Sequence, residues 1–310
     1  TNSYYYNLDQ TLQVQYRKNA TDSKYNFTVG LSVLPQYSKM NYSGMGLVDT
    51  LLTRTVFNFT PTLQYRYRWP RQQQINVSYN GRSSQPQMNQ LLDITDDSNP
   101  LSIQKGNPGL KPTFSNTFQV SYNNYIPSTM TSYNTRFSIG NTMRSIQNKT
   151  TLNSNFGTTS QPVNMDGFAA NWNTSLNAGL NVTLPDDRFS ISADGSGSFR
   201  HQEGWASIAG QDAQLRKTNT TGANGRLTGE YRGDILSVQL LGNLNYNHSV
   251  NDLQPDRNMD TYDFNYGTNF TAMFPWRNAR LASDIQMQSR RGYSADMDTD
   301  ELGWNCSGSF

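Results

Sequence analysis

The residues best suited to acid–base, metal or nucleophilic chemistry are few in this 310-residue chain, and they do not gather. His201 and His248 are the only histidines, and neither has a second ligand at the spacing of a zinc site. Cys306 is the single cysteine, so no internal disulfide can form. No serine lies in a nucleophile elbow. The sequence therefore predicts no cofactor and no enzymatic activity.

Two acidic runs resemble metal sites at first sight. The aspartates of 296–300 alternate as the first ligands of a calcium loop do. Such a loop needs glycine at its sixth position and glutamate at its twelfth, where this chain has Glu301 and Ser307. The run at 93–97 has no ligand spacing either. We interpret both as solvated loops, and the sequence predicts no metal site.

Arginine is the remaining residue type with strong binding chemistry, because its guanidinium donates paired hydrogen bonds to carboxylates and phosphates. The net charge of +2 is too small to indicate a nucleic-acid partner. The most basic run, Tyr65–Arg71, alternates aromatic residues and arginines, as a strand with two different faces does. Charged side chains recur at such polar positions along the chain, and the candidates for binding are Arg66, Arg68, Arg82, Arg136, Asp194 and Arg200.

The elements that would position these side chains are β-strands. Apolar and polar residues alternate along almost the whole chain, and in 168–184 the residues Trp172, Leu176 and Leu180 oppose asparagines and serines. The pattern predicts roughly thirteen strands of about ten to sixteen residues, whereas strands of soluble proteins cluster near five or six. Strands of this length suit a tilted membrane span with an extension into solvent.

The connections between the predicted strands alternate between short turns and long polar segments. Short turns are expected at 19–23, after Pro70, and at 126–130, 185–187, 233–234 and 275–278. Long segments are expected at 36–53, 81–112, 141–166 and 201–217. A transmembrane barrel has short periplasmic turns and long outer loops. Aromatic residues beside the short turns are expected to form an interfacial girdle. They are Tyr16, Tyr25, Tyr67, Trp69, Tyr122, Tyr125, Tyr133, Phe189, Tyr231, Phe274 and Trp276.

Composition separates a membrane barrel from a soluble β-sandwich. Hydrophobic residues make up 35% and aromatic residues 12% of the chain, so disorder is a poor explanation of its low mean hydropathy of −0.73. Charged residues are only 15%, and the polar face consists mainly of Asn, Ser, Thr and Gln. A wet lumen explains an uncharged lining better than a free surface does. We predict an all-β, antiparallel, up-and-down transmembrane β-barrel, with a β-sandwich adhesin as the alternative.

Several stretches carry a family resemblance. Three of them resemble the mid-barrel signature of TonB-dependent transporters. They are Arg82–Leu91, Asn99–Leu101 and the run Gly106, Asn107, Pro108, Gly109, Leu110, Lys111 and Pro112. They resemble most closely the outer-membrane β-barrel family of the Bacteroidetes, and Thr299–Asn305 resembles a late strand start of that family. We expect the family motif to have a structural role. The residues of this run that match it are Gly106, Asn107, Pro108, Leu110, Lys111 and Pro112.

The resemblance implies a 22-stranded barrel in the Gram-negative outer membrane, closed by an amino-terminal plug and driven by the TonB complex. Residues 1–310 then form a partial barrel domain, with the plug and the terminal strands outside this segment. The implied partners are outer-membrane lipid, the plug, the TonB complex and a small nutrient. The six charged residues of the polar face would line the lumen and contact plug or solute. A passive porin or a secretion-associated barrel remains an alternative function.

Overall fold

The computed structural model describes residues 2–22, 24–44, 47–152, 157–184, 186–206, 212–274, 279–293 and 296–310, and most of them lie in β-strands. One large sheet contains β1 (Asn2–Asp9), β2 (Leu12–Asn19), β3 (Tyr25–Gly44), β4 (Leu47–Trp69), β5 (Gln73–Ser84), β8 (Thr113–Ile126), β9 (Thr131–Met143), β12 (Asn171–Thr183), β13 (Phe189–Ala206), β14 (Gln214–Arg232), β15 (Leu236–Asn251), β16 (Met259–Phe274), β17 (Ala279–Arg291) and β18 (Asp300–Ser309). Among the described residues, no helix is both long and apolar enough to cross a membrane.

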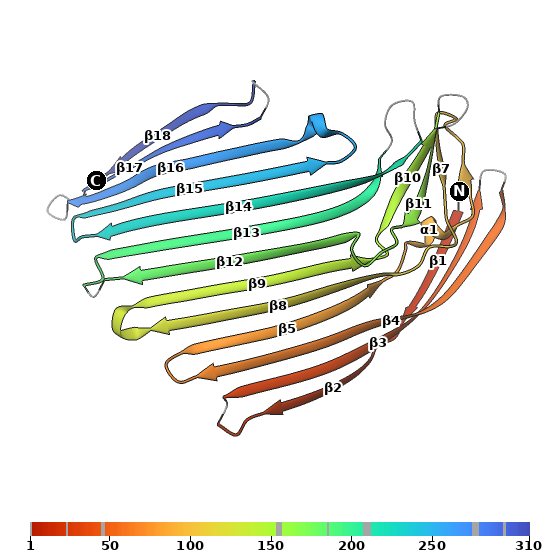
Figure 1. Cartoon of the computed structure of the whole chain (residues 1–310), viewed down its shortest axis with the longest axis horizontal. Helices are drawn as coiled ribbons and strands as arrows, with labels where there is room; N and C mark the ends of the chain where they lie inside the picture. Colours follow the sequence, from red (N-terminus) through yellow and green to blue (C-terminus); the bar gives the residue numbers. More distant parts are fainter. Residues whose placement is uncertain are drawn as a thin grey trace.

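The large sheet is antiparallel and follows the order of the chain. Each strand from β3 to β18 pairs with the next strand of the sheet (Figure 1). β1 and β2 both pair with β3, β2 along 26–33 and β1 along 36–43, so together they act as one edge strand. The described part of the chain therefore has thirteen strand positions, which agrees with the strand number predicted from alternation.

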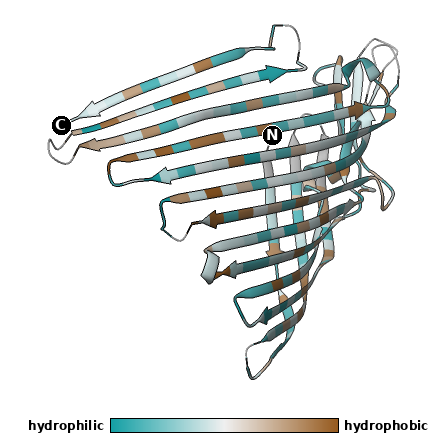
Figure 2. Ribbon diagram, turned by 60° about the vertical axis from the view of Figure 1, so that its left-hand side comes forward, coloured by the Kyte–Doolittle hydropathy of each residue, from teal (hydrophilic) through white to brown (hydrophobic). Residues whose placement is uncertain are grey.

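The sheet forms a curved wall with two free edges. Its first strands turn behind the middle ones (Figure 2). Within the described residues, no pairing joins β18 to β1 or β2. The wall is therefore an open arc.

Strand register separates the wall into two faces of opposite character. One row of paired residues runs across the sheet through Asn19, Asn26, Arg66, Asn76, Ser121, Arg136, Asn177, Ser196, Asn224, Asn245, Asp263 and Arg290. Every member of this row is polar. Large apolar side chains on the other face remain exposed to surroundings, for example Leu176 at 50%, Ile191 at 54% and Leu240 at 59%.

The exposed apolar face excludes the β-sandwich. In a sandwich, Phe27, Leu63, Trp172 and Phe270 would pack beneath a second sheet, but none of them belongs to the buried class. Among the described residues, no side chain is fully buried. The fold is an antiparallel transmembrane β-barrel wall whose apolar face meets lipid.

Two predicted loops are strands. β3 and β4 continue through most of 36–53, and β13 and β14 cover 201–206 and 214–217. The prediction was wrong because alternation marks a strand only where one face meets lipid, and these extensions present polar residues on both faces. The sequence also missed β1, which extends the wall at its first edge.

A second, small sheet lies at the outer end of the wall, within the two longest connections. It consists of β6 (Thr95–Asp96), β7 (Ser102–Lys105), β10 (Ile146–Leu152) and β11 (Thr158–Asn164), in the order β10-β11-β7-β6. The short helix α1 (Met88–Leu91) lies beside it (Figure 1). The expected long polar stretch 141–166 thus contains a hairpin.

The short turns lie at the opposite end of the strands. They include 20–24, 70–72, the 3₁₀ turn Pro127–Thr129 and 233–235, where the Gly233 amide donates to the Leu236 carbonyl at 2.8 Å. The expected turn at 275–278, with Trp276, lies outside the described residues. A second 3₁₀ turn, Pro255–Arg257, occupies the outer connection between β15 and β16.

The aromatic girdle is visible on the apolar face beside these turns. Tyr67 and Trp69 rings lie 4.7 Å apart, and Phe189 and Tyr231 rings also lie 4.7 Å apart. Tyr125 is an exception, because it pairs with Ser132 on the polar face. The prediction for Tyr125 was wrong, since it counted proximity to the turn and ignored the alternation of faces.

Candidate functional site at the outer end of the polar face

The motif Gly106–Pro112 joins the small sheet to β8. The amide of Gly106 donates to the Ile94 carbonyl at 3.1 Å, and the amide of Asn107 donates to the Gln90 carbonyl at 2.7 Å. The Asn107 side chain folds back and accepts from the Gly109 amide at 2.9 Å, which closes an Asx turn. These bonds hold the motif against the end of α1.

The motif also binds the second long connection. Asn107 Nδ2 donates to the Pro162 carbonyl at 2.9 Å, and Gln161 Nε2 donates to the Gly106 carbonyl at 3.0 Å. Asn164 accepts from the Lys111 amide at 2.7 Å and donates to the Lys111 carbonyl at 3.0 Å. A run that is continuous in sequence therefore fastens β11 to the connection between β5 and β8.

Apolar burial concentrates at this junction. The buried apolar residues among those described are Leu91, Leu92, Leu110, Met165, Ala170 and Ala213. All but Ala213 belong to the two connections that the motif joins. The wall itself has no such core, because its apolar face is turned to lipid. Gly106 lies so close to the Leu92 carbonyl that a side chain there would overlap it.

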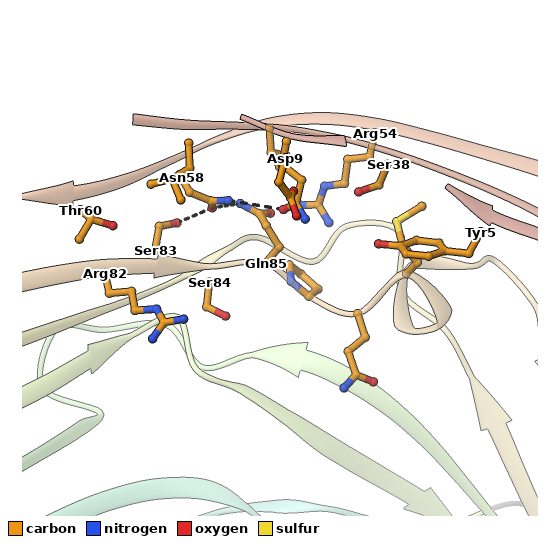
Figure 3. A pocket seen from close by; sticks show the side chains of 16 residues that line it. Tyr5, Asp9, Ser38, Arg54, Asn58, Thr60, Arg82, Ser83, Ser84 and Gln85 are labelled. Atoms are coloured by element: carbon orange, nitrogen blue, oxygen red, sulfur yellow. Dashed lines mark hydrogen bonds between the residues drawn. The ribbon is translucent and has the colours of Figure 1, made fainter. Parts of the chain in front are cut away.

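A polar cavity of about 400 Å³ lies beneath α1 on the polar face of the wall. Its charged lining residues are Asp9 from β1, Arg54 from β4 and Arg82 from β5. Figure 3 shows Arg54 from β4 and Asp9 from β1, the two strands on either side of β3, reaching toward Gln85, with Tyr5 across the cavity. Most other lining side chains are amides and hydroxyls, including Gln36, Ser38, Asn58, Thr60, Ser83 and Ser84.

The cavity holds unused hydrogen-bonding capacity. Arg54 Nη2 donates to the Leu110 carbonyl at 3.4 Å, which is a weak bond, and Arg54 Nη1 is buried without a partner. The carbonyl oxygen of the Gln85 side chain is likewise buried and unpaired, while its amide nitrogen donates to Asn58. Buried polar groups normally have partners, so these atoms mark a place that a ligand can complete.

Arg54 lies beyond the membrane-spanning part of β4. At about 3.3 Å per residue and a tilt of about 40°, it stands roughly 38 Å from Trp69 along the barrel axis, whereas the apolar band is about 25 Å tall. Burial of the guanidinium lowers the pKa of Arg54. Arginine nevertheless stays protonated at neutral pH, so the cavity contains a partly desolvated positive charge.

The structure places all six predicted lumen candidates on the polar face, and all six are exposed. Arg66 and Arg136 share one register row, and Arg66 donates to Asn76 at 2.8 Å. Arg68 donates to Gln74 at 3.2 Å, one row nearer the short turns. The polar cavity takes in Arg82 alone of the six.

Asp194 and Arg200 lie apart from the other four. Asp194 pairs in register with Arg226, and Arg200 pairs with Asn173 and Thr220.

The sequence did not identify Arg17, Arg54 and Asp9 as binding candidates. Arg54 lies at an even-numbered position of the same strand as Arg66 and Arg68, and this shared parity was the signal for it.

The other candidate residues have local structural partners. His201 pairs with Glu203 at 3.5 Å, and His248 with Asp260 at 2.6 Å. Asp300 pairs with Arg291 at 2.8 Å. In the part of the chain that the structure describes, no three His, Cys, Asp or Glu side chains are grouped as metal ligands.

The family model of the outer membrane protein beta-barrel family matches residues 2–301. No curated protein sequence matches the chain. Among solved structures, the β domain of the Bordetella autotransporter BrkA is similar at 10% identity, covering 99% of this chain and 97% of that chain. Its TM-score is 0.29, which is too low to carry a structural argument.

Proposed function

We propose that this chain, which belongs to the outer membrane protein beta-barrel family, is part of a TonB-dependent transporter that takes up a scarce nutrient through a plugged barrel. As a member of that family, it is a β-barrel protein of the Gram-negative outer membrane. The transport role and its dependence on TonB are our inference. The resemblance of Gly106–Pro112 to the transporter signature supports it.

The observation that carries the proposal is the width of the polar wall. Barrels of about eight strands are filled by their own side chains, whereas thirteen positions here still form an open arc. Its polar face carries mostly short amide and hydroxyl side chains, which leave space inside. An unobstructed lumen of this width would leak small solutes, and barrels of about twenty-two strands carry a plug.

The free edges of the wall support a larger barrel. No described residue pairs with the outer edges of β1, β2 and β18. In hydrocarbon each unpaired backbone group costs several kcal/mol, so membrane sheets close on themselves. We therefore expect further strands to complete the ring, with residues 1–310 as one part of the barrel domain and the plug as another part of the protein.

Conductance of the full-length protein in planar lipid bilayers tests the proposal. A plugged transporter is expected to show no steady ionic conductance, and removal of the plug is expected to open a large one. Uptake by cells should also stop when the TonB complex is deleted. Steady conductance by the intact protein, or uptake that persists without TonB, would refute the plugged transporter and favour a passive porin.

A further inference from the structure

Charge is distributed unevenly over the polar face. On β1–β9 this face carries Arg17, Arg54, Arg66, Arg68, Arg82 and Arg136, and Asp9 is its one carboxylate among the side chains that the structure describes. On β14–β18 the same face carries both signs, such as Glu230 with Arg232 at 2.6 Å. The whole chain has a net charge of only +2. The net positive charge of the polar face is therefore concentrated on the first half of the wall, where carboxylates do not offset the arginines.

These arginines are not neutralised by carboxylates. No ion pair involves any of the six within the described residues, and Arg66 and Arg68 bond only to amide oxygens. A concave wall that carries charge of one sign focuses the electrostatic field and attracts ions of the opposite charge. Two further hollows nearer the short turns, lined by Arg17, Arg66 and Arg68 among others, continue the positive surface along this wall.

We propose that the cavity lined by Arg54 and Arg82 binds the carboxylate or phosphate group of an anionic solute, as the outermost site of a positively charged path along β1–β9. The inference rests on the proposed uptake function for the origin of the solute. Arg54 offers the buried Nη1 that lacks a partner, and Arg82 adds a second guanidinium, which is exposed. The amide and hydroxyl lining suits a hydroxyl-rich body attached to the anionic group.

The lining also argues against other ligand classes. A cation would meet two guanidinium groups and one carboxylate, Asp9. An apolar ligand would leave the unpaired atoms of Arg54 and Gln85 without hydrogen-bond partners, which is unfavourable for buried polar groups. An oxyanion satisfies the arginine, and a hydroxyl group beside it can donate to the Gln85 oxygen.

Equilibrium binding by the full-length protein, purified in a phosphate-free detergent, tests the site. Inorganic phosphate is followed by broadening of its ³¹P NMR signal, and glucuronate and glucose serve as a matched pair of competitors. We expect saturable broadening that glucuronate reverses and glucose does not. R54Q should weaken binding by about tenfold or more, which is the loss of one charge-assisted hydrogen bond. R280Q, at an exposed arginine of the same face on β17, outside the cavity and outside β1–β9, should change it by less than about twofold.

Absence of broadening with the wild-type protein would overturn the proposal, as would equal weakening by R54Q and R280Q. If R54Q fails to assemble, R82Q serves in its place, because the Arg82 side chain is exposed and its loss should leave folding intact. R82Q should weaken phosphate binding by about threefold or more. Binding in detergent needs no TonB complex, so loss of binding and loss of TonB-dependent uptake are separate results.

Discussion

Replacement of Gly106 by alanine tests the role of the motif most directly. A Cβ at this position would overlap the Leu92 carbonyl oxygen and lie 3.2 Å from the Gln90 carbonyl oxygen. Both oxygens belong to the backbone around the end of α1, so neither can move aside as a flexible side chain would. The motif must therefore separate from α1 in the variant.

Separation would remove three hydrogen bonds around Gly106. They are the bonds from the Gly106 amide to Ile94, from the Asn107 amide to Gln90 and from the Gln161 side chain to the Gly106 carbonyl, of 3.1, 2.7 and 3.0 Å. At about 1 kcal/mol each, their loss destabilises the closed connection by about 3 kcal/mol. Local opening should then be about 100-fold more frequent.

Limited trypsin digestion of the assembled protein measures this opening, because the exposed Lys105 directly precedes the motif and the Lys105–Gly106 bond is a trypsin site. G106A should be cleaved there about 100-fold faster than the wild type. G109A is the matched control, since its Cβ would meet only the flexible Asn107 side chain, at 3.1 Å. The folded fraction on unheated gels should stay unchanged in both variants. Cleavage of G106A at the wild-type rate would refute the assigned role of the junction.

Three further outcomes are expected. Alanine at both prolines of Gly106–Pro112 should destabilise the start of β8 by about 1 kcal/mol and lower the assembled fraction more than uptake per assembled molecule; an unchanged fraction on unheated gels would contradict this. L176R, on the lipid face, should lower the free energy of unfolding by about 2–4 kcal/mol, measured by urea unfolding from vesicles. The neighbouring variant N177R, on the polar face, should change it by less than about 0.5 kcal/mol. Equal losses in the two variants would contradict the assignment of the faces. In the 20–24 turn, the Lys24 side chain and amide hold the pKa of Asp22 below its ordinary value near 3.8, so their bonds persist above that value and are lost as pH falls through the lowered pKa. D22N at pH 7 should therefore speed hydrogen exchange of the Lys24 amide by less than about tenfold, and no acceleration would contradict the assignment.

Sequence predicted the wall well because lipid imposes a strict rule on it. A strand such as β12 presents apolar residues at most of its alternate positions, and Trp172, Leu176, Ala178, Leu180 and Val182 follow this rule, with Thr174 as the exception. Above the bilayer the rule ends, since both faces of a strand meet water. The extensions of β3 and β4 therefore carried no readable alternation, and the 146–164 hairpin was hidden in a polar stretch.

The binding side chains were only partly predictable for the same reason. Arg66 and Arg68 lie within the alternating part of β4, where their polar face was evident. Arg54 directly follows the predicted loop 36–53, before the alternation of β4 becomes readable, so its face was not assigned. Which arginines meet in one cavity depends on strand register and on how α1 folds over the wall, and a single sequence specifies neither.

The two parts of this chain are held by different forces, and this difference predicts how each responds to substitution. The wall depends on ladder hydrogen bonds and on lipid around its apolar face, so it tolerates polar changes inside and resists charge outside. The outer junction depends on burial of Leu91, Leu92 and Leu110 and on bonds from the motif, as a small soluble core does. Since the cavity lies between them, with Arg54 from the wall donating to Leu110 of the junction, loosening the motif should weaken oxyanion binding while the barrel stays assembled. G106A is thus expected to lose phosphate broadening in parallel with its gain in trypsin sensitivity, and retention of full binding in an opened junction would show that the wall residues form the site without the junction.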